Sequence, residues 1–302
     1  MYSKCYTIDY MAKGKSKDGW GGTWTEEKLV DFEKYVSAYL KIMNKYRDIH
    51  HWKLIYMDAF AGSGMRESKK TSPVLFDEPE ASGVYRGAAE RVLSIPLRGF
   101  DYYYFIDSDK KACDDLRQRL QGDADDPRLQ FRHGNANDYI KSLGNTLQAN
   151  KKYKSLALLD PFGMQVNWEA LTHLKNTDTD LWVLVPSGVV IGRLLKNDGS
   201  LRYPKRLECH LGLSEKEIKD RFYSEKTEKT LLGDVTTLSK FAHPTRLIAE
   251  LYRERLTGLF KHVAAPKPLL TSRGFPIYHF VFASNNATAQ KIADYIIGKG
   301  KK

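Results

Sequence analysis

The stretch Leu54-Ile55-Tyr56-Met57-Asp58-Ala59-Phe60-Ala61-Gly62-Ser63-Gly64 indicates the fold, because an apolar run ends in an aspartate and two glycines follow. The run predicts a buried β-strand over residues 53–58, and the glycines predict a tight turn. Glycine lets the backbone approach a ligand that a side chain would hold off. The pattern favours a nucleotide-binding loop, but an empty strand-to-helix turn can carry the same two glycines.

Predicted strands and helices alternate along the chain on either side of this stretch. A helix with apolar residues at helical spacing is expected after Thr25, which can cap it. The alternation predicts an α/β fold with a doubly wound, mostly parallel sheet. Further strands are expected over 102–107, 129–133, 155–160 and 181–185, and further helices over 84–94, 109–120, 139–147 and 168–174.

The C-terminal third has a different composition. Residues 195–240 are rich in charge and hold too few apolar residues for a core of their own, so we expect a helical cap inserted into one domain spanning 1–302. Pro244 opens a helix to about residue 260. A strand pair is expected over 262–270 and 277–282, with a last helix over 287–297.

The charge and residue composition of the chain indicate which kinds of binding partner to expect. Net charge is +11, which favours an anionic partner, nucleic acid first, although a basic surface can also serve solubility alone. The cysteines and histidines lack the spacing of a zinc site. No apolar stretch approaches the length of a membrane span, so we expect no membrane partner and, by default, a cytoplasmic location.

Polar side chains follow three of the predicted parallel strands. Asp58 can accept a hydrogen bond from the amino group of a methionine-like ligand, and Asp107 can accept both hydroxyls of a ribose. Asn135 or Asp138 could accept from an adenine amino group. The alternatives without a ligand are a helix cap at Asp107 and a turn or a cap at Asn135. The long gap between Gly64 and Asp107 argues against NAD, unless an insertion over residues 65–83 accounts for the excess, and S-adenosylmethionine is the cofactor we expect.

The most specific motif is Asp160-Pro161-Phe162-Gly163, at the end of the fourth parallel strand. The Asp160 carboxylate and the Pro161 carbonyl can accept both protons of an exocyclic amine, which aims the nitrogen lone pair at a methyl donor. Phe162 can stack on a flipped base. The alternative is a turn that only ends the strand. Four polar motifs in this order predict a ligand site at the carboxyl edge of the sheet.

Taken together, the motifs resemble a known family, the three-Cys-motif partner proteins (TcmP). The resemblance covers about residues 20 to 297 and rests on Trp24 to Leu29, Asp58 to Gly62, Tyr104 to Asp107, Leu159 to Gly163 and Pro186 to Arg193. It implies a bacterial protein with a seven-stranded Rossmann-like methyltransferase sheet and a partner protein that carries three cysteines. The Asp160 to Gly163 motif is also similar to the catalytic motif of tRNA guanine N2-dimethyltransferases.

The resemblance implies roles for individual residues. Asp58, Phe60, Gly62 and Gly64 would hold the methionine end of S-adenosylmethionine, Asp107 its ribose and Asn135 its adenine. Asp160, Pro161 and Phe162 would act on an exocyclic amine of a nucleic-acid base. Two alternatives stay open: a partner subunit without activity, and a methyltransferase for small molecules or proteins. No metal is expected.

Several residues are secondary candidates. Gly163, Arg193 and Tyr203 are expected to contact the substrate, the last within a basic stretch with Lys196, Arg202, Lys205 and Arg206. The alternative to nucleic-acid contact is that this stretch is simply a charged surface exposed to solvent. Arg86 is a second candidate for a phosphate, with surface ion pairing as its alternative. Trp24 and Lys28 could close the pocket, but packing for Trp24 and solvation for Lys28 are the expected roles.

Overall fold

A central sheet organises the protein in the computed structural model, which describes residues 23–64, 86–121, 125–230 and 233–298. Five strands, β1 to β5, run parallel, and their buried apolar runs explain why the sequence forms them. The strands of the sheet are β1 (Lys53–Asp58), β2 (Tyr102–Asp107), β3 (Leu129–His133), β4 (Tyr153–Leu159), β5 (Thr179–Val185), β8 (His262–Val263), β9 (Lys267–Leu270) and β10 (Pro276–Ser284).

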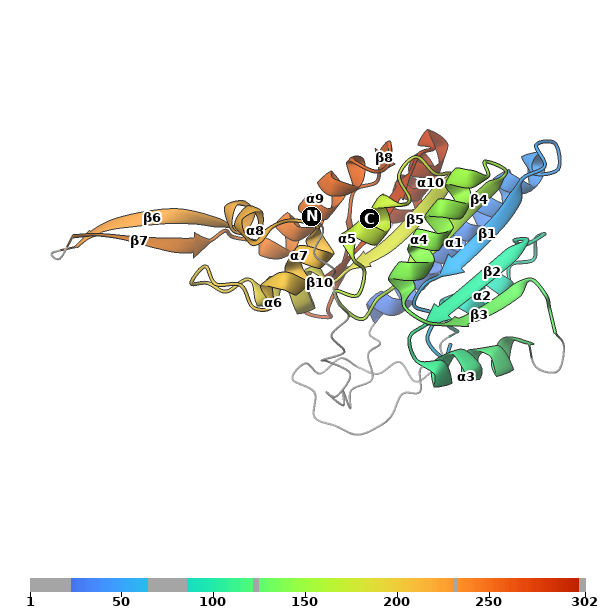
Figure 1. The fold of residues 1–302 in the computed structure, drawn as a ribbon, viewed down its shortest axis with the longest axis horizontal. Helices are drawn as coiled ribbons and strands as arrows, with labels where there is room; N and C mark the ends of the chain where they lie inside the picture. The colour runs from blue at the N-terminus through green and yellow to red at the C-terminus, as the bar shows by residue number, and fades with distance from the viewer. Residues whose placement is uncertain (1–22, 65–85, 122–124, 231–232, 299–302) are drawn as a thin grey trace.

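The strand order is β3-β2-β1-β4-β5-β10-β8, and β10 runs antiparallel to both of its neighbours in this path (Figure 1). This path confirms the predicted seven-stranded, mostly parallel, doubly wound sheet. An eighth strand, β9, also pairs with β10. The order reverses between β1 and β4, and in open α/β sheets ligands bind outside the carboxyl ends of the strands at such a point.

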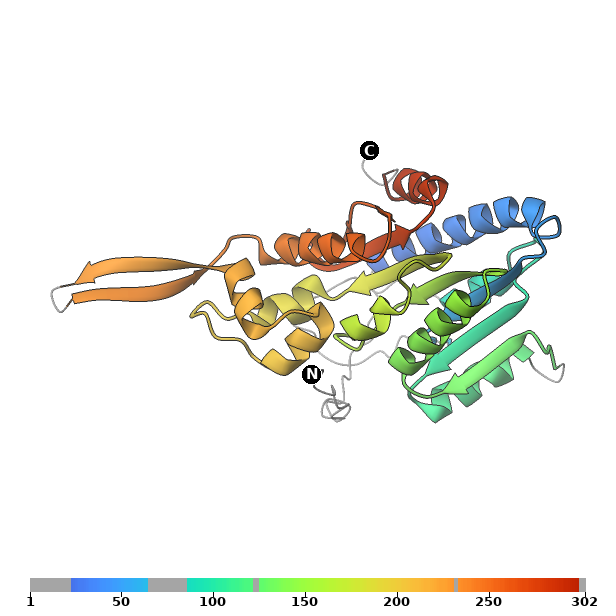
Figure 2. The same cartoon turned by 45° about the horizontal axis from the view of Figure 1, so that its top comes forward.

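Helices cover both faces of the sheet (Figure 2). One core contains the buried faces of α4, α5, α7, α8 and α9, and the other contains those of α1, α2 and α10. Alternate residues of each strand enter the two cores, as Leu54 and Ile55 do. The helices are α1 (Thr23–Tyr46), α2 (Ala88–Leu93), α3 (Lys110–Gln121), α4 (Ala136–Ala149), α5 (Trp168–Thr172), α6 (Gly192–Leu194), α7 (Pro204–Leu211), α8 (Glu215–Phe222), α9 (Pro244–Thr257) and α10 (Ala287–Gly298).

Two local expectations need correction. Thr25 lies inside α1 rather than capping it, since the helix already includes Thr23. Arg86 precedes α2 instead of lying within it, because that helix begins at Ala88. A π-helix, η1 (Ser187–Ile191), directly follows β5 and was not predicted.

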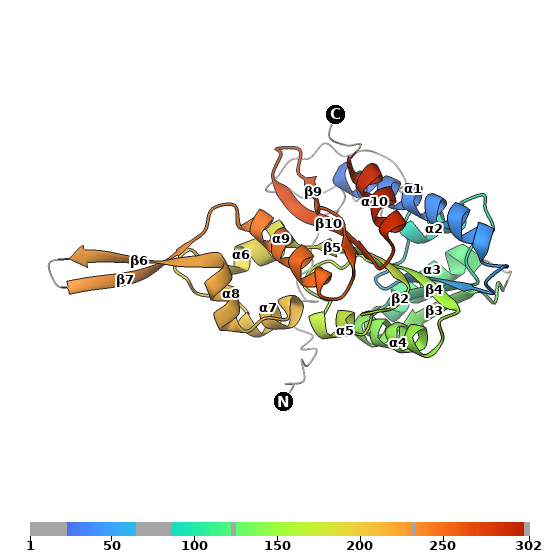
Figure 3. The ribbon, with the colours of Figure 1, turned by 90° about the horizontal axis from the view of Figure 1, so that it is seen from above.

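The cap is only partly helical. Helices α7 and α8 occupy its first half, and a two-stranded antiparallel ribbon of β6 (Tyr223–Thr230) and β7 (Gly233–Lys240) forms the second. The ribbon extends away from the central sheet (Figures 1 and 3; Figure 3 is the view from above). Its strands consist mostly of charged residues, serines and threonines without a regular alternation of apolar residues, which is why the sequence did not indicate strands.

A helix that spans a membrane has to be both long and apolar. Among the residues that the structure describes, no helix is both long enough and apolar enough to cross a bilayer.

Candidate functional site

The register of the sheet brings the polar motifs to one edge. Asp58 ends β1 and pairs with Phe105 of β2 and Leu158 of β4. Asp107 and Asp160 each lie two residues beyond those partners, so the three carboxylates lie at the carboxyl ends of adjacent parallel strands, with Asp107 and Asp160 two residues further along than Asp58. Asn135 lies two residues beyond His133, which pairs with Asp107. The carboxyl edge therefore collects four of the predicted site residues.

The loop after β1 is held by its neighbours on both sides. Ala59 donates its N–H to the Leu158 carbonyl at 3.1 Å, and Ala61 donates to the Ile106 carbonyl at 2.9 Å. Gly62 and Gly64 have φ angles of +61° and +73°, a left-handed conformation that favours glycine. Among the residues that the structure describes, a Cβ atom at Gly62 would meet nothing within 4 Å. The loop is thus fixed by the sheet while its Gly62 face is open to a ligand.

Asp107 links this loop to the next strand. Its Oδ2 accepts the Gly62 N–H at 2.9 Å, and its Oδ1 accepts the Asp109 N–H at 2.8 Å. The cap of α3 is instead Asp109, whose Oδ1 accepts from Lys111 at 2.8 Å. Asp107 is therefore not the ordinary helix cap considered as the alternative, and its carboxylate lies beside the open glycine loop.

Asn135 has the cap geometry that was the alternative to a ligand role. Its Oδ1 accepts from the Asn137 N–H at 2.9 Å at the start of α4. The buried Asn137, which sequence reasoning missed, joins two loops: its side chain donates to the Gln165 carbonyl at 2.9 Å and accepts the Asn167 N–H at 2.8 Å. No signal in the sequence distinguishes Asn137 from its neighbour.

Lys28 is the second residue that sequence reasoning misjudged. It was expected to be solvated, but its side chain is only 1% exposed and its Nζ lies 2.5 Å from Asp160 Oδ2. Nζ also lies 5.7 Å from the centre of the Trp24 ring. The partner of this lysine is 132 residues away in the chain. A single sequence contains no signal for such a contact, which explains the error.

Helix α1 brings Lys28 to the site, because ion pairs and a ring contact hold the start of α1 against β9 and β10. Lys267 of β9 places its Nζ 2.6 Å from Asp31 and 2.5 Å from Glu27. Trp24 stacks on Tyr278 of β10 at 5.2 Å between ring centres, which confirms its predicted packing role. The start of α1 therefore covers the end of β4.

Asp58 has an unusual pKa. Burial, and after it the nearby Asp160 carboxylate, raise the pKa of this carboxyl from 3.8 to about 7. The Phe60 N–H, which the carboxyl accepts at 3.2 Å, and the Lys28 ammonium oppose that rise in pKa. Three carboxylates share this edge with one buried lysine, so a cation would find favourable electrostatics there.

Within the Asp160 to Gly163 motif, the side chains change from buried to exposed over two residues. Asp160 is half-buried, Pro161 is buried, and the Phe162 side chain is 69% exposed. Gln165 fixes the turn because its Oε1 accepts the Phe162 N–H at 2.9 Å. An exposed phenylalanine beside a held carboxylate is not explained by core packing.

The secondary candidates Arg193 and Tyr203 lie outside this cluster. Arg193 is exposed on α6, and Tyr203 is exposed at the start of α7. Within the described part of the chain, no hydrogen bond or ion pair joins either residue to Asp58, Asp107 or Asp160. Arg86 is exposed as well, with its carbonyl accepting from Arg91 Nε at 3.1 Å.

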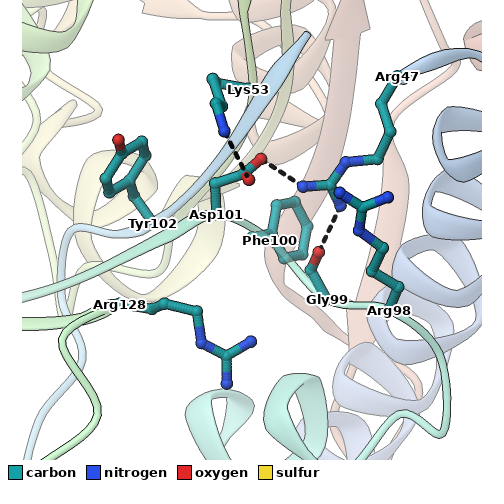
Figure 4. Close-up of a pocket in the computed structure, with 8 residues that line it drawn as sticks. All are labelled: Arg47, Lys53, Arg98, Gly99, Phe100, Asp101, Tyr102 and Arg128. Atoms are coloured by element: carbon teal, nitrogen blue, oxygen red, sulfur yellow. Dashed lines mark hydrogen bonds and ion pairs between the residues drawn. The ribbon is translucent and has the colours of Figure 1, made fainter. Parts of the chain in front are cut away.

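A cavity of about 320 Å³ lies at the opposite, amino-terminal edge of the sheet (Figure 4). None of the predicted site residues lines it. Its four cations already have carboxylate partners, so we assign the cavity no role in the site. The pairs are Arg47 and Lys53 with Asp101, Arg98 with Asp48, and Arg128 with Asp126.

In residues 23–64, 86–121, 125–230 and 233–298, no group of three or more His, Cys, Asp or Glu side chains is arranged to hold a metal ion.

Comparison with solved structures finds weak similarity over most of the chain. A Legionella pneumophila protein of the family model DUF519 matches 86% of this chain and 98% of its own, with 14% identity and a TM-score of 0.38. Trm1 from Pyrococcus horikoshii, solved with S-adenosyl-L-methionine, matches 88% of this chain with 14% identity and a TM-score of 0.36. The match spans 57% of the Trm1 chain.

Neither a family model nor a curated protein matches the chain, so the resemblance to three-Cys-motif partner proteins stays a prediction. The roles proposed below rest on the geometry of the carboxyl edge.

Proposed function

We propose that this chain transfers the methyl group of S-adenosylmethionine to an exocyclic amine of a nucleic-acid base. The observation that carries the proposal is the Asp160-Pro161-Phe162 turn, in which a carboxylate held by a buried lysine stands beside an exposed aromatic ring. The turn follows β4, and the open glycine loop follows the adjacent β1. A donor and an acceptor bound at these two loops would be neighbours.

The residues around the glycine loop fit the cofactor. S-adenosylmethionine carries a sulfonium and an ammonium group, and the edge offers three carboxylates against one buried lysine. Gly62 leaves room for a ligand, since a Cβ there would meet nothing within 4 Å. Asp58 and the loop backbone would hold the methionine end, and Asp107 the ribose. When bound, the cofactor supplies an electrophilic methyl group on sulfur.

The acceptor amine would be oriented by Asp160 and Pro161. Lys28 engages Oδ2 of Asp160, so Oδ1 and the Pro161 carbonyl are the atoms proposed to accept the two amine protons. That arrangement points the nitrogen lone pair away from both acceptors and toward the donor. The cofactor would supply the methyl group with its sulfur as the leaving group, and Asp160 or water would accept the proton that the methylated amine loses. Alignment of the two reactants provides most of the rate gain.

Phe162 would hold the base. Its exposed ring belongs to the residue directly after Pro161, whose carbonyl is proposed to accept an amine proton. One base could therefore stack on the ring and hydrogen-bond to that carbonyl at the same time. A base inside a duplex cannot reach this turn, so the target would be unpaired or flipped.

Calorimetry and a transfer assay test the proposal. Wild-type protein should bind S-adenosylmethionine, and Asp107→Ala should weaken binding by about tenfold or more, since hydrogen bonds to charged groups contribute about 1.5–3 kcal/mol. Asp114→Ala, an exposed aspartate on α3, is the matched control. Radiolabelled methyl should pass to RNA or DNA with wild type and not with Asp160→Ala.

Other results would refute the proposal. Absence of cofactor binding would exclude any methyltransferase. Transfer to proteins or small molecules alone would replace the nucleic-acid substrate. Stable co-purification with a three-cysteine protein and no turnover would favour the partner-subunit alternative.

A further inference from the structure

Three surface segments contact the π-helix η1 or the helix α6 that continues it. A Cβ at Gly163 would lie 3.9 Å from Val190, so the Asp160 to Gly163 turn lies beside η1. A Cβ at Gly188 would lie 2.2 Å from the Pro276 carbonyl, so the start of β10 contacts η1 through its backbone. Helix α6 continues η1, and its Leu194 carbonyl accepts the Arg202 N–H at 2.9 Å. π-helices occur frequently at functional sites.

Each of these three segments presents an exposed aromatic ring next to its contact with η1 or α6. Phe162 precedes Gly163, Phe275 precedes Pro276, and Tyr203 follows Arg202. Phe162, Phe275 and Tyr203 are 69%, 66% and 47% exposed. We call these three residues the aromatic rim. Because an exposed group of large apolar side chains marks an interaction surface, core packing alone does not account for the rim.

Tyr203 adds a second observation. Its backbone is left-handed, with φ 57° and ψ 56°, which is uncommon for a bulky residue. Strained backbone of this kind concentrates at functional sites. The Arg202 guanidinium lies 5.2 Å from the centre of the Tyr203 ring. A cation next to an aromatic ring is the pairing with which proteins hold unpaired bases and their phosphates.

The charge around the rim suits a phosphate backbone. Residues 192–206 hold five cations and one carboxylate, Asp198. Within the described ranges, Lys205 alone among those cations forms a salt bridge, with Glu208 at 3.0 Å. The other four cations are exposed and lack a carboxylate partner there, namely Arg193, Lys196, Arg202 and Arg206.

We propose that the aromatic rim binds single-stranded nucleic acid on either side of the target base, which is an inference that rests on the proposed function. Phe162 would take the target base, while Phe275 and Tyr203 would stack on its unpaired neighbours. The cations of residues 192–206 would follow the phosphates. A duplex is not the fitting occupant, because its bases already stack on one another and cannot cover the rings.

Fluorescence anisotropy with a labelled oligouridylate and a duplex of equal length tests the rim without any need for the cofactor. Wild type should prefer the single strand, and added salt should weaken binding. Phe275→Ala and Tyr203→Ala should each weaken binding by about 5- to 150-fold, while Tyr203→Phe keeps it. Matched controls are Tyr295→Ala on α10, 64% exposed, and Tyr46→Ala on α1, 47% exposed.

The rim is refuted if the duplex binds better, if no nucleic acid binds, or if the control variants lose as much affinity as the rim variants. Cofactor binding by calorimetry separates this result from the proposed function. Methyl transfer with unchanged oligonucleotide affinity in Phe275→Ala and Tyr203→Ala would refute the rim alone. Rim-dependent binding without cofactor binding would refute the methyltransferase alone.

Discussion

Replacing Asp58 with Asn should stabilise the cofactor-free protein above neutral pH. Asp58 is buried at the end of β1, and burial together with Asp160 raises its pKa from 3.8 to about 7. A group whose pKa is raised by folding contributes its full stability below the pKa of the unfolded chain, and loses it as pH rises through the folded pKa. The relevant window therefore runs from about pH 4 to pH 8.

The size of the effect follows from the shift in pKa. Each unit of pKa difference corresponds to about 1.4 kcal/mol, so ionised Asp58 costs the fold about 4 kcal/mol at pH 8. At pH 5, where Asp58 is mostly protonated in the folded protein, its cost to the free energy of folding is only about 2 kcal/mol. Asparagine does not ionise, and its carbonyl can still accept the Phe60 N–H. The advantage of Asp58→Asn in free energy of unfolding should therefore grow by about 2–3 kcal/mol between pH 5 and pH 8.

Urea denaturation of wild type and Asp58→Asn at a series of pH values measures this difference. Asp180, whose pKa burial raises to about 6, is present in both proteins and cancels. Asp114→Asn on the exposed face of α3 should show no such pH-dependent difference. A stability difference between wild type and Asp58→Asn that stays constant from pH 5 to pH 8 would refute the raised pKa. The same variant should bind S-adenosylmethionine more weakly than wild type.

Three further variants test the geometry of the site. Lys28→Met should lower the free energy of unfolding by about 3 kcal/mol, because it leaves Asp160 without its buried partner. The double variant with Asp160→Asn should regain most of that loss in urea denaturation. Gly188→Ala should lower stability by about 2 kcal/mol, since its Cβ would lie 2.2 Å from the Pro276 carbonyl, whereas Gly298→Ala meets nothing within 4 Å and should not. Phe162→Ala should leave the melting temperature unchanged and reduce methyl transfer about fivefold or more.

Strands with continuous apolar runs were predictable because their signal is local. The predicted bounds of β1, β2 and β3 agree with the structure, and each run ends at a polar residue. Their order at the carboxyl edge follows from parallel pairing, so the neighbourhood of Asp58, Asp107 and Asp160 could be inferred before any coordinates. The functional roles of these residues stay predictions.

Features that depend on distant partners could not be predicted. The burial of Lys28 depends on Asp160, and no local pattern distinguishes this lysine from a solvated one. The ribbon β6–β7 is stabilised by pairing between its two strands, which carry no alternating apolar face. The aromatic rim needs the contacts of η1, which join residues from three separate parts of the chain.

The carboxyl edge combines an energetic cost with a binding preference. The Asp58 carboxyl, whose pKa burial and the Asp160 carboxylate raise to about 7, destabilises the fold when it ionises, and the buried Lys28 opposes only part of that rise. A ligand with two positive charges would relieve it by pairing with the carboxylates that repel one another. A neutral ligand of the same shape would leave the repulsion in place. Under the proposed function, the feature that weakens the fold would also select a cationic methyl donor over its thioether product, which would favour release after transfer.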